Sequence, residues 1–438
     1  MKLWKNLPVW IGMWFAYSAC AQTNGVDAGR TISLEEALDR TLATDQSIQV
    51  ALEEVRKSDL VRWSALTRVG PRVTGNGSYN NPKENITTAQ GPLIVESWRG
   101  DVTVQQPLVD LTVFAAYRAG RLGSQASRYS YNYTVRGVLF GVARAYYDVL
   151  KKSRLAEVNR RTLDLSQQQL ELAQNRAKSG EVTKTDTLQA KVAVERARRV
   201  LTASENALTL SRHTLGSLLN LGTNETFQVI EPAPATLGTD TLETLQARAA
   251  SQREDLRAAS LGISQSRERE REVRAQYGPK LLAQWSNQWV DPETTSSRNN
   301  FWQAGVAMSV PLFAGGQREV DLVKTKHETR QSQLRSQDLA KTVNLDVQDA
   351  WLSVQTLTQN LQALESEVAA AEEALKTVQN QYRAGTATSL SVQTALNDLN
   401  TSRTDQTVAL YDFQVALRNL ERVTGTLQEE RISRLNKR

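Results

Sequence analysis

Apolar residues recur every seven positions in two long segments of the chain. The later series is Val347, Val354, Leu361, Val368, Leu375 and Tyr382, interleaved at spacings of three and four with Ala350, Leu357, Leu364, Ala371 and Val378. The earlier series is Val142, Val149, Ala156, Leu163, Leu170 and Ala177. Such sustained heptads predict long helices that pack side by side as in a coiled coil. A helix over 113–178 is expected to be on the order of 100 Å long.

The positions of proline and glycine predict where these helices run and turn. None of the ten prolines lies in 112–231 or 312–438, and a proline inside a helix costs about 3 kcal/mol. Gly180 and Gly385 suit the left-handed position just past a helix end, since glycine has no Cβ to clash there. Thr183 and Thr388 follow at the right distance to cap a returning helix. Each block therefore predicts a helical hairpin.

The same order of features occurs twice along the chain. Four pairs of landmarks match: SLEEALDRTLATDQSI with TLETLQARAASQREDL, Gly70-Pro71 with Gly278-Pro279, QPLVD with VPLFA, and Gly180 with Gly385. An internal duplication of this length predicts a tandem repeat. The expected plan is a signal peptide at 1–21, repeat 1 at 22–221, a linker loop at 222–240, repeat 2 at 241–425 and a C-terminal tail at 426–438.

Between the matched landmarks, apolar and polar residues alternate with a period of two. The segments are VTGNGSYNN, SWRGDVTVQQP, LLAQWSNQWV and FWQAGVAMSVP. They predict β-hairpins at about 70–108 and 278–312. Strands of about nine to eleven residues with aromatic ends are typical of a transmembrane β-barrel, although a soluble sheet with one face on a core would give a similar pattern.

Four strands cannot close into a barrel, and an open sheet edge in lipid leaves backbone groups unsatisfied at several kcal/mol each. Several chains would therefore have to assemble. Two chains supply eight strands and a filled bore, whereas three supply twelve and a lumen. The residues alone leave that number open.

The N-terminus has the character of an export signal. Lys2 and Lys5 precede an apolar run that ends in small residues, and the run is too short for a spanning helix. Cleavage after Ala21 fits an A-x-A site. Alternatively, Ser18-Ala19-Cys20 resembles a bacterial lipobox that would make Cys20 the lipidated first residue. Both alternatives predict an exported mature chain.

Composition excludes several classes of function. The 53 basic and 47 acidic residues are well mixed and leave a net charge of +6, which indicates solvated helix faces and no nucleic-acid partner. Cys20, His213 and His327 are the only cysteine and histidines, so ligands for a thiolate or imidazole metal site are lacking. The sequence contains no G-x-S-x-G, H-E-x-x-H or P-loop motif. We therefore predict no catalytic, cofactor-binding or metal-binding residue, and no enzymatic activity.

The export signal, the duplicated strand-then-helix plan, YRAGTATSLSVQTALNDL (382–399) and AKSGEVTKTDTLQAKVAVERA (177–197) together resemble the TolC-type outer-membrane efflux family, over about residues 30–425. The resemblance implies an α+β membrane protein: a homotrimer with a twelve-stranded barrel, four strands per chain, in the outer membrane of a Gram-negative-type cell. It also implies a long α-helical coiled-coil barrel across the periplasm. The protein would be the passive exit duct of a tripartite efflux or type I secretion system.

The resemblance also implies partners. These are a periplasmic adaptor protein, an inner-membrane pump and the lipid bilayer. In the lipidated alternative, acyl chains on Cys20 would add an anchor. A second hypothesis is a periplasmic coiled-coil adaptor or scaffold without a pore. Adaptors usually carry a single helical hairpin, whereas this sequence predicts two, each after its own strand pair, which favours the duct.

By the same resemblance, the two glycine turns form the periplasmic tip. The residues implied to contact the adaptor are Gly180, Val182, Thr183, Gly385, Ala387 and Thr388. The pore entrance would be lined near Asp186, Ser391 and Thr394. Acidic residues often stand six and nine positions after the second glycine in this family, and here those positions are Ser391 and Thr394. Asp186 is also placed to complete a capping box with Thr183, so these positions do not predict an acidic ring.

Overall fold

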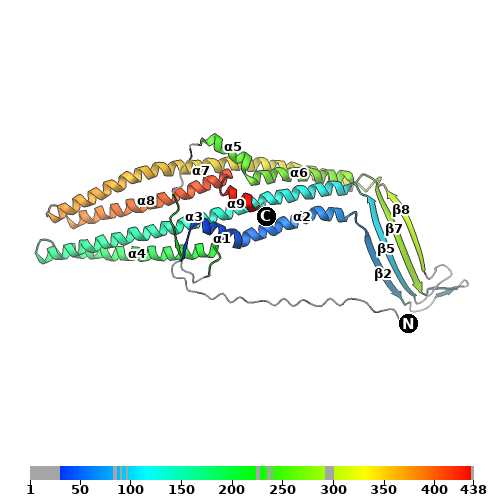
Figure 1. The fold of residues 1–438 in the computed structure, drawn as a ribbon, viewed down its shortest axis with the longest axis horizontal. Coiled ribbons are helices and arrows are strands. Elements are labelled where there is room, and N and C mark those ends of the chain that lie inside the picture. Colours follow the sequence, from blue (N-terminus) through cyan, green and yellow to red (C-terminus); the bar gives the residue numbers. More distant parts are fainter. Residues whose placement is uncertain are drawn as a thin grey trace.

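The computed structural model describes residues 30–81, 86–88, 91–94, 97–222, 227–233, 238, 240–291 and 300–435. The molecule is elongated, with a sheet at one end and the turns of two helical hairpins at the other (Figure 1). The signal peptide predicted at 1–21, with its Cys20, lies outside the described residues. The same holds for 82–85, 89–90 and 95–96 of the first predicted β-hairpin and for 292–299 of the second.

Helices dominate the described part of the chain. They are α1 (Leu34–Thr44), α2 (Gln46–Thr67), α3 (Thr112–Lys178), α4 (Lys184–Leu218), α5 (Leu242–Gln252), α6 (Glu254–Ala275), α7 (Gln317–Arg383), α8 (Ser389–Thr424) and α9 (Glu429–Leu435). Helices α3 and α7 each contain 67 residues, which at 1.5 Å per residue makes each about 100 Å long. Both begin just after the PLV and PLF segments and run through the proline-free blocks.

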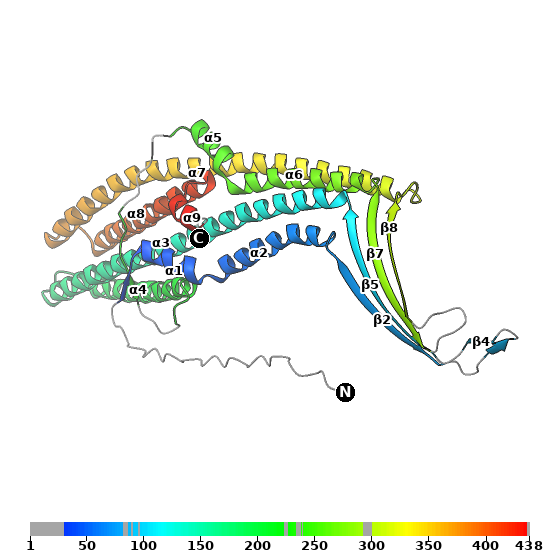
Figure 2. The ribbon, with the colours of Figure 1, turned by 45° about the vertical axis from the view of Figure 1, so that its right-hand side comes forward.

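The strands are β1 (Arg30–Ile32), β2 (Arg72–Asn80), β3 (Ile86–Thr88), β4 (Gly91–Ile94), β5 (Ser97–Val109), β6 (Phe227–Val229), β7 (Lys280–Asp291) and β8 (Asn300–Ser309). Four of them form one antiparallel sheet in the order β2-β5-β7-β8. The sheet continues from the ends of α2, α3, α6 and α7 and bends away from them (Figure 2). Within one chain the sheet is open, with β2 and β8 at its edges.

Each strand pair of this sheet has a regular register over most of its length. Tyr79 of β2 lies opposite Trp98 of β5, and their ring centroids are 4.6 Å apart. Every residue of β2 and of β8 is exposed. The two edge strands therefore present unpaired backbone groups and uncovered side chains to whatever lies beside them.

Toward the hairpin turns, the long helices lie in one row. Helix α4 packs on α3, α3 packs on α8, and α8 packs on α7. On the sheet side the row becomes α2, α3, α6 and α7. The heptad positions form the contacts of these rows: Val347, Val354, Val368, Leu375 and Tyr382 are all buried. Helices α4 and α7 are the outer members of the row that ends at the turns.

Shorter elements cover the middle of the row. Helix α1, β1 and β6 pack on α3, and α5 packs on α7 and α8. The segment 222–240 was predicted to be a linker loop, but it contains β6, which pairs in parallel with β1. Tyr146 of α3 secures this pairing, because its hydroxyl lies 2.9 Å from the Ile32 carbonyl oxygen and accepts from the Ile230 amide at 3.0 Å. The predicted C-terminal tail likewise contains α9.

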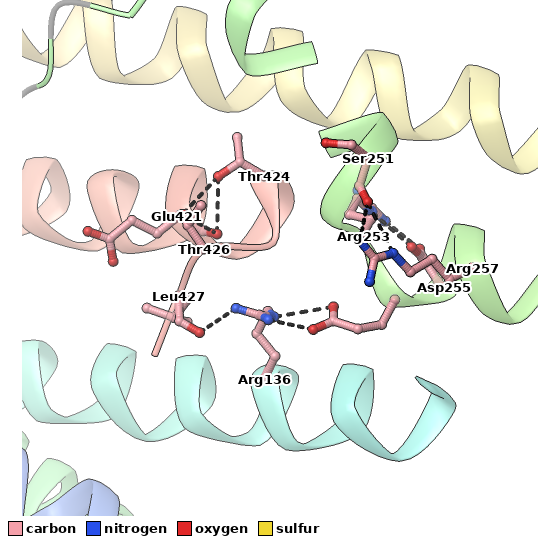
Figure 3. Close-up of polar contacts among 10 residues, drawn as sticks. Arg136, Ser251, Arg253, Asp255, Arg257, Glu421, Thr424, Thr426 and Leu427 are labelled. Carbon is pink, nitrogen blue, oxygen red and sulfur yellow. Dashed lines mark hydrogen bonds and ion pairs between the residues drawn. The ribbon is translucent and has the colours of Figure 1, made fainter. Parts of the chain in front are cut away.

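A buried ion pair fastens the start of α6 to α3. Arg136 is 3% exposed and Glu254 is 6% exposed. The Arg136 guanidinium donates to both carboxylate oxygens of Glu254 and to the carbonyl oxygen of Leu427, beyond the end of α8 (Figure 3). Both repeats and the C-terminal segment therefore converge on one arginine side chain.

Candidate functional site

The first hairpin turn closes with hydrogen bonds that only a left-handed residue permits. Gly180 has φ +76°. Its amide donates to the Ala177 carbonyl, and the Glu181 amide donates to the Arg176 carbonyl, which is the Schellman pattern of a helix end. Helix α4 then begins with the predicted capping box. The Asp186 amide donates to Thr183 Oγ1 at 3.3 Å, and the Thr183 amide donates to Asp186 Oδ2 at 3.0 Å.

The second turn repeats this geometry with different capping chemistry. Gly385 has φ +79°, and the Gly385 and Thr386 amides donate to the Tyr382 and Gln381 carbonyls. Thr388 Oγ1 accepts from the Ser391 amide at 3.2 Å, as predicted for an N-cap. Because Ser391 carries a hydroxyl where the first turn has the Asp186 carboxylate, no acidic side chain closes this cap.

Arg176 and Tyr382 join the two turns. The Arg176 guanidinium carbon lies 4.9 Å from the centroid of the Tyr382 ring, and the guanidinium also donates to the Tyr382 carbonyl oxygen. Arg176 Nε donates to Glu181 Oε2 at 2.9 Å. Sequence reasoning placed Tyr382 in a helix seam and overlooked Arg176 altogether. The available signal was a basic residue in the last turn of a helix, which has many ordinary explanations.

Apolar packing reinforces this link. Tyr382, Val392 and Leu396 belong to a buried cluster at the tip end of α7 and α8. Val182 of the first turn and Ala387 of the second both pack against it while remaining partly exposed. Gly180, Thr183, Gly385 and Thr388 are exposed. The structure therefore brings all six predicted adaptor-contact residues to one end of the molecule.

The electrostatics of the tip centre on the phenol of Tyr382, which is 2% exposed. Burial raises the pKa of Tyr382, the Arg176 guanidinium opposes that rise, and the Asp186 carboxylate adds to it. The phenol therefore stays neutral at physiological pH. Asp186 lies close enough to influence it, although the Asp186 carboxylate is already engaged by Thr183.

The three residues predicted at the pore entrance do not form one cluster. Asp186 is half-buried in its capping box on α4. Ser391 and Thr394 are exposed on α8 and line a groove of about 710 Å³ between α7 and α8, together with Glu367 and Asp398. The acidic residues of this groove therefore do not stand six and nine positions after Gly385, where the resemblance indicated them.

Other predicted features are located as follows. His213 and His327 are exposed, on α4 and α7. Within the described ranges, no three histidine, cysteine or acidic residues are grouped as a metal site would require. Of the helices that the structure describes, none combines the length and apolarity needed to cross a membrane.

Comparison with known proteins identifies relatives that match most of the chain. The model of a family described as outer membrane efflux protein matches residues 37–221 and again residues 245–426. The alkaline protease secretion protein AprF of Pseudomonas aeruginosa is 23% identical over 419 residues, covering 91% of this chain and 85% of AprF. The outer membrane protein TolC of Vibrio cholerae is also 23% identical, over 83% of this chain and 86% of TolC.

Solved structures show the same fold. The outer membrane protein VceC from Vibrio cholerae superimposes with a TM-score of 0.76 at 19% sequence identity. The match covers 90% of this chain and 96% of VceC. The row of long helices with a sheet at one end is therefore an arrangement that is known from experiment.

Proposed function

The chain belongs to the outer membrane efflux protein family, whose members are outer-membrane channels of efflux or secretion systems, and we propose that it works as a homotrimer docked to an adaptor and an inner-membrane pump. The protein resides in the outer membrane and extends into the periplasm. It is a transport protein. In this proposal it catalyses no reaction, and the pump supplies the energy.

The open edges of the sheet are the observation that carries the trimer. An edge strand in lipid leaves backbone groups without partners, at several kcal/mol for each group. Pairing β8 of one copy with β2 of the next joins two different surfaces, which is a heterologous contact. Such a contact generates a ring when the rotation from one copy to the next returns to the first copy. Three copies supply twelve strands and a lumen, whereas two copies supply a bore that side chains fill.

Exposed apolar side chains at the same two edges support this arrangement. Trp63 on α2 is 55% exposed, and Phe313, between β8 and α7, is 81% exposed. Large apolar groups in contiguous exposed patches mark surfaces that a partner covers. In the proposed ring, the α2 edge of one copy meets the α7 edge of the next. The side chains of Trp63 and Phe313 are then buried in the junction between copies.

The helical row extends the same ring into a tunnel. Helices α4 and α7 are its outer members and meet across each junction between copies, so that twelve helices enclose the lumen. The two glycine turns form the far end of this tunnel. There the exposed residues Gly180, Thr183, Gly385 and Thr388, with Val182 and Ala387, contact the adaptor, and Asp186, Ser391 and Thr394 lie near the entrance.

Two finer parts of the sequence plan belong to this proposal. Residues 22–221 and 241–425 are copies of an ancestral unit, supported by one family model matching each half. Cys20 either carries acyl chains or leaves with the signal peptide at 1–21. The relatives are channels and secretion proteins, which favours the duct over the periplasmic adaptor or scaffold that the sequence left as an alternative.

Planar-bilayer recording tests the proposal. Purified protein is expected to insert and give discrete ion conductance, and native mass spectrometry of the same sample is expected to show the mass of three chains. A folded trimer that conducts nothing would contradict the duct. A stable monomer or dimer with full conductance would contradict the trimer. Trp63→Glu is expected to reduce the trimer fraction, because it places a charge in the buried junction.

A further inference from the structure

A large groove lies between the two helical hairpins, near the middle of the long helices α3 and α7. Its volume is about 1220 Å³, and four helices line it. Thr214 and Leu218 come from α4, Arg144 and Lys151 from α3, and further residues from α7 and α8. The groove is therefore lined by the two outer helices of the row, α4 and α7, as well as by its two inner helices.

The helical positions of the lining residues show which face of the row carries the groove. Val142, Tyr146 and Val149 of α3 pack in the core formed with α1, β1 and β6. Successive residues of a helix are rotated by about 100°, which places Arg144 and Lys151 on the opposite face of α3. The groove therefore faces away from the covering elements. In the proposed ring, the face opposite those covering elements lines the lumen of the tunnel.

The charges of the groove are not balanced. Lys151 Nζ lies 3.0 Å from Asp412 Oδ1 and 3.8 Å from Asp148 Oδ1, so these three groups neutralise one another in part. Arg144 is exposed and has no ion-pair partner among the residues that the structure describes. Asp148, one turn further along α3, also lines the groove, but its ion pair is with Lys151. A free guanidinium therefore projects from the wall of the groove.

A second guanidinium in the groove lies over an aromatic ring. The Arg422 guanidinium carbon lies 5.2 Å from the centroid of the Phe140 ring, and its nitrogens donate to Asn419 Oδ1 at 3.1 and 2.9 Å. This partner is a neutral amide, so the charge of Arg422 remains available to an anion. Leu218, Leu357 and Val415 add apolar surface beside these cations.

We propose that this groove is a binding station in the tunnel for amphipathic organic anions. The acid group of the ligand pairs with Arg144 and Arg422, since charge-assisted hydrogen bonds from arginine to an oxyanion are the strong ones. The apolar part of the ligand packs on Phe140 and its aliphatic neighbours. The orientation of the groove toward the lumen rests on the proposed ring, and three copies place three such stations at one level.

The test uses full-length protein in detergent with naphthalene-2-sulfonate as the probe and its uncharged analogue, naphthalene-2-methanol, as the comparison. Isothermal titration is expected to show that the sulfonate binds more tightly than the alcohol. Arg144→Gln combined with Arg422→Gln is expected to weaken sulfonate binding by about tenfold and to leave binding of the alcohol unchanged. Arg121→Gln is the matched control, because Arg121 is exposed on the same helix outside the groove.

The outcomes separate this inference from the proposed function. Equal binding of the two probes, or of the sulfonate by the double variant and the wild type, would overturn the binding station even if the channel conducts normally. If the station exists in a conducting trimer, the sulfonate also reduces single-channel current, and the double variant relieves this block. Tight, arginine-dependent binding without any effect on current would overturn the lumenal placement. Absence of conductance itself would count against the duct.

Discussion

The Arg176 guanidinium of the first hairpin stacks on the Tyr382 ring of the second, with 4.9 Å between the guanidinium carbon and the ring centroid. The same side chain donates to the Tyr382 carbonyl oxygen and to Glu181. It thereby links a backbone group of one turn to a side chain of the other. Arg176 therefore supplies polar contacts that hold the two tips of a single chain together.

Arg176→Ala is expected to loosen the tip. Cation–π contacts of partly desolvated arginine are worth about 0.5–2 kcal/mol, and the charged hydrogen bonds are lost as well. Amide hydrogen exchange within 381–390 should accelerate by roughly tenfold, in proportion to that free energy. Arg198→Ala is the control, because Arg198 forms an exposed ion pair with Glu195 on the same hairpin. Unchanged exchange in Arg176→Ala would show that apolar packing alone holds the turns together.

Gly385→Val is expected to weaken export without abolishing trimer assembly. A β-branched residue at φ +79° is strained, by about 1–2 kcal/mol at the least. The turn lies far from the sheet, where the copies are proposed to pair in the membrane. Efflux or secretion in cells and native mass spectrometry measure the two effects separately. Gly385→Asn should be milder, because asparagine tolerates the left-handed region. Normal export by the valine variant would mean that the tip has no strict conformational demand here.

The turns were predictable because the physics that fixes them is local. A glycine past a helix end and a threonine three residues later satisfy nearby backbone groups, and both turns formed as expected at Gly180 and Gly385. Long helices were equally readable from heptads and missing prolines. Contacts between the repeats could not be predicted in this way, since nothing near Arg136 in the sequence indicates Glu254 as its partner. The parallel pairing of β1 with β6 was missed for the same reason.

Breaking the buried pair of Arg136 and Glu254 is expected to be costly. Both side chains are almost fully buried, and removing one partner from such a pair leaves an uncompensated charge, at about 3–5 kcal/mol. Glu254→Ala should therefore lower the melting temperature markedly, and Glu254→Gln should do so less. Glu205→Ala, which breaks an exposed pair with Arg160, should change it little. Equal melting of Glu254→Ala and wild type would show that the Leu427 carbonyl alone satisfies Arg136.

Alkaline pH should destabilise the middle of the helical row through Tyr146. Burial raises the pKa of this phenol to about 12, against about 10 in an unfolded chain. The native state therefore holds the proton more tightly. This contribution to stability is complete below about pH 10 and is lost as the pH rises through 12, by about 3 kcal/mol in all.

The variant Tyr146→Phe isolates the contribution of the Tyr146 hydroxyl to the pH dependence of stability. The variant should be less stable than wild type at pH 8, by about 1–3 kcal/mol, because the Ile32 and Ile230 backbone groups lose their hydroxyl partner. Its stability should then fall less steeply than that of wild type between pH 10 and 12, as followed by the melting temperature. Tyr411, whose pKa burial and Glu231 also raise to about 12, keeps a residual slope in the variant. Parallel curves for the two proteins would show that Tyr146 ionises in the folded state as readily as in the unfolded one.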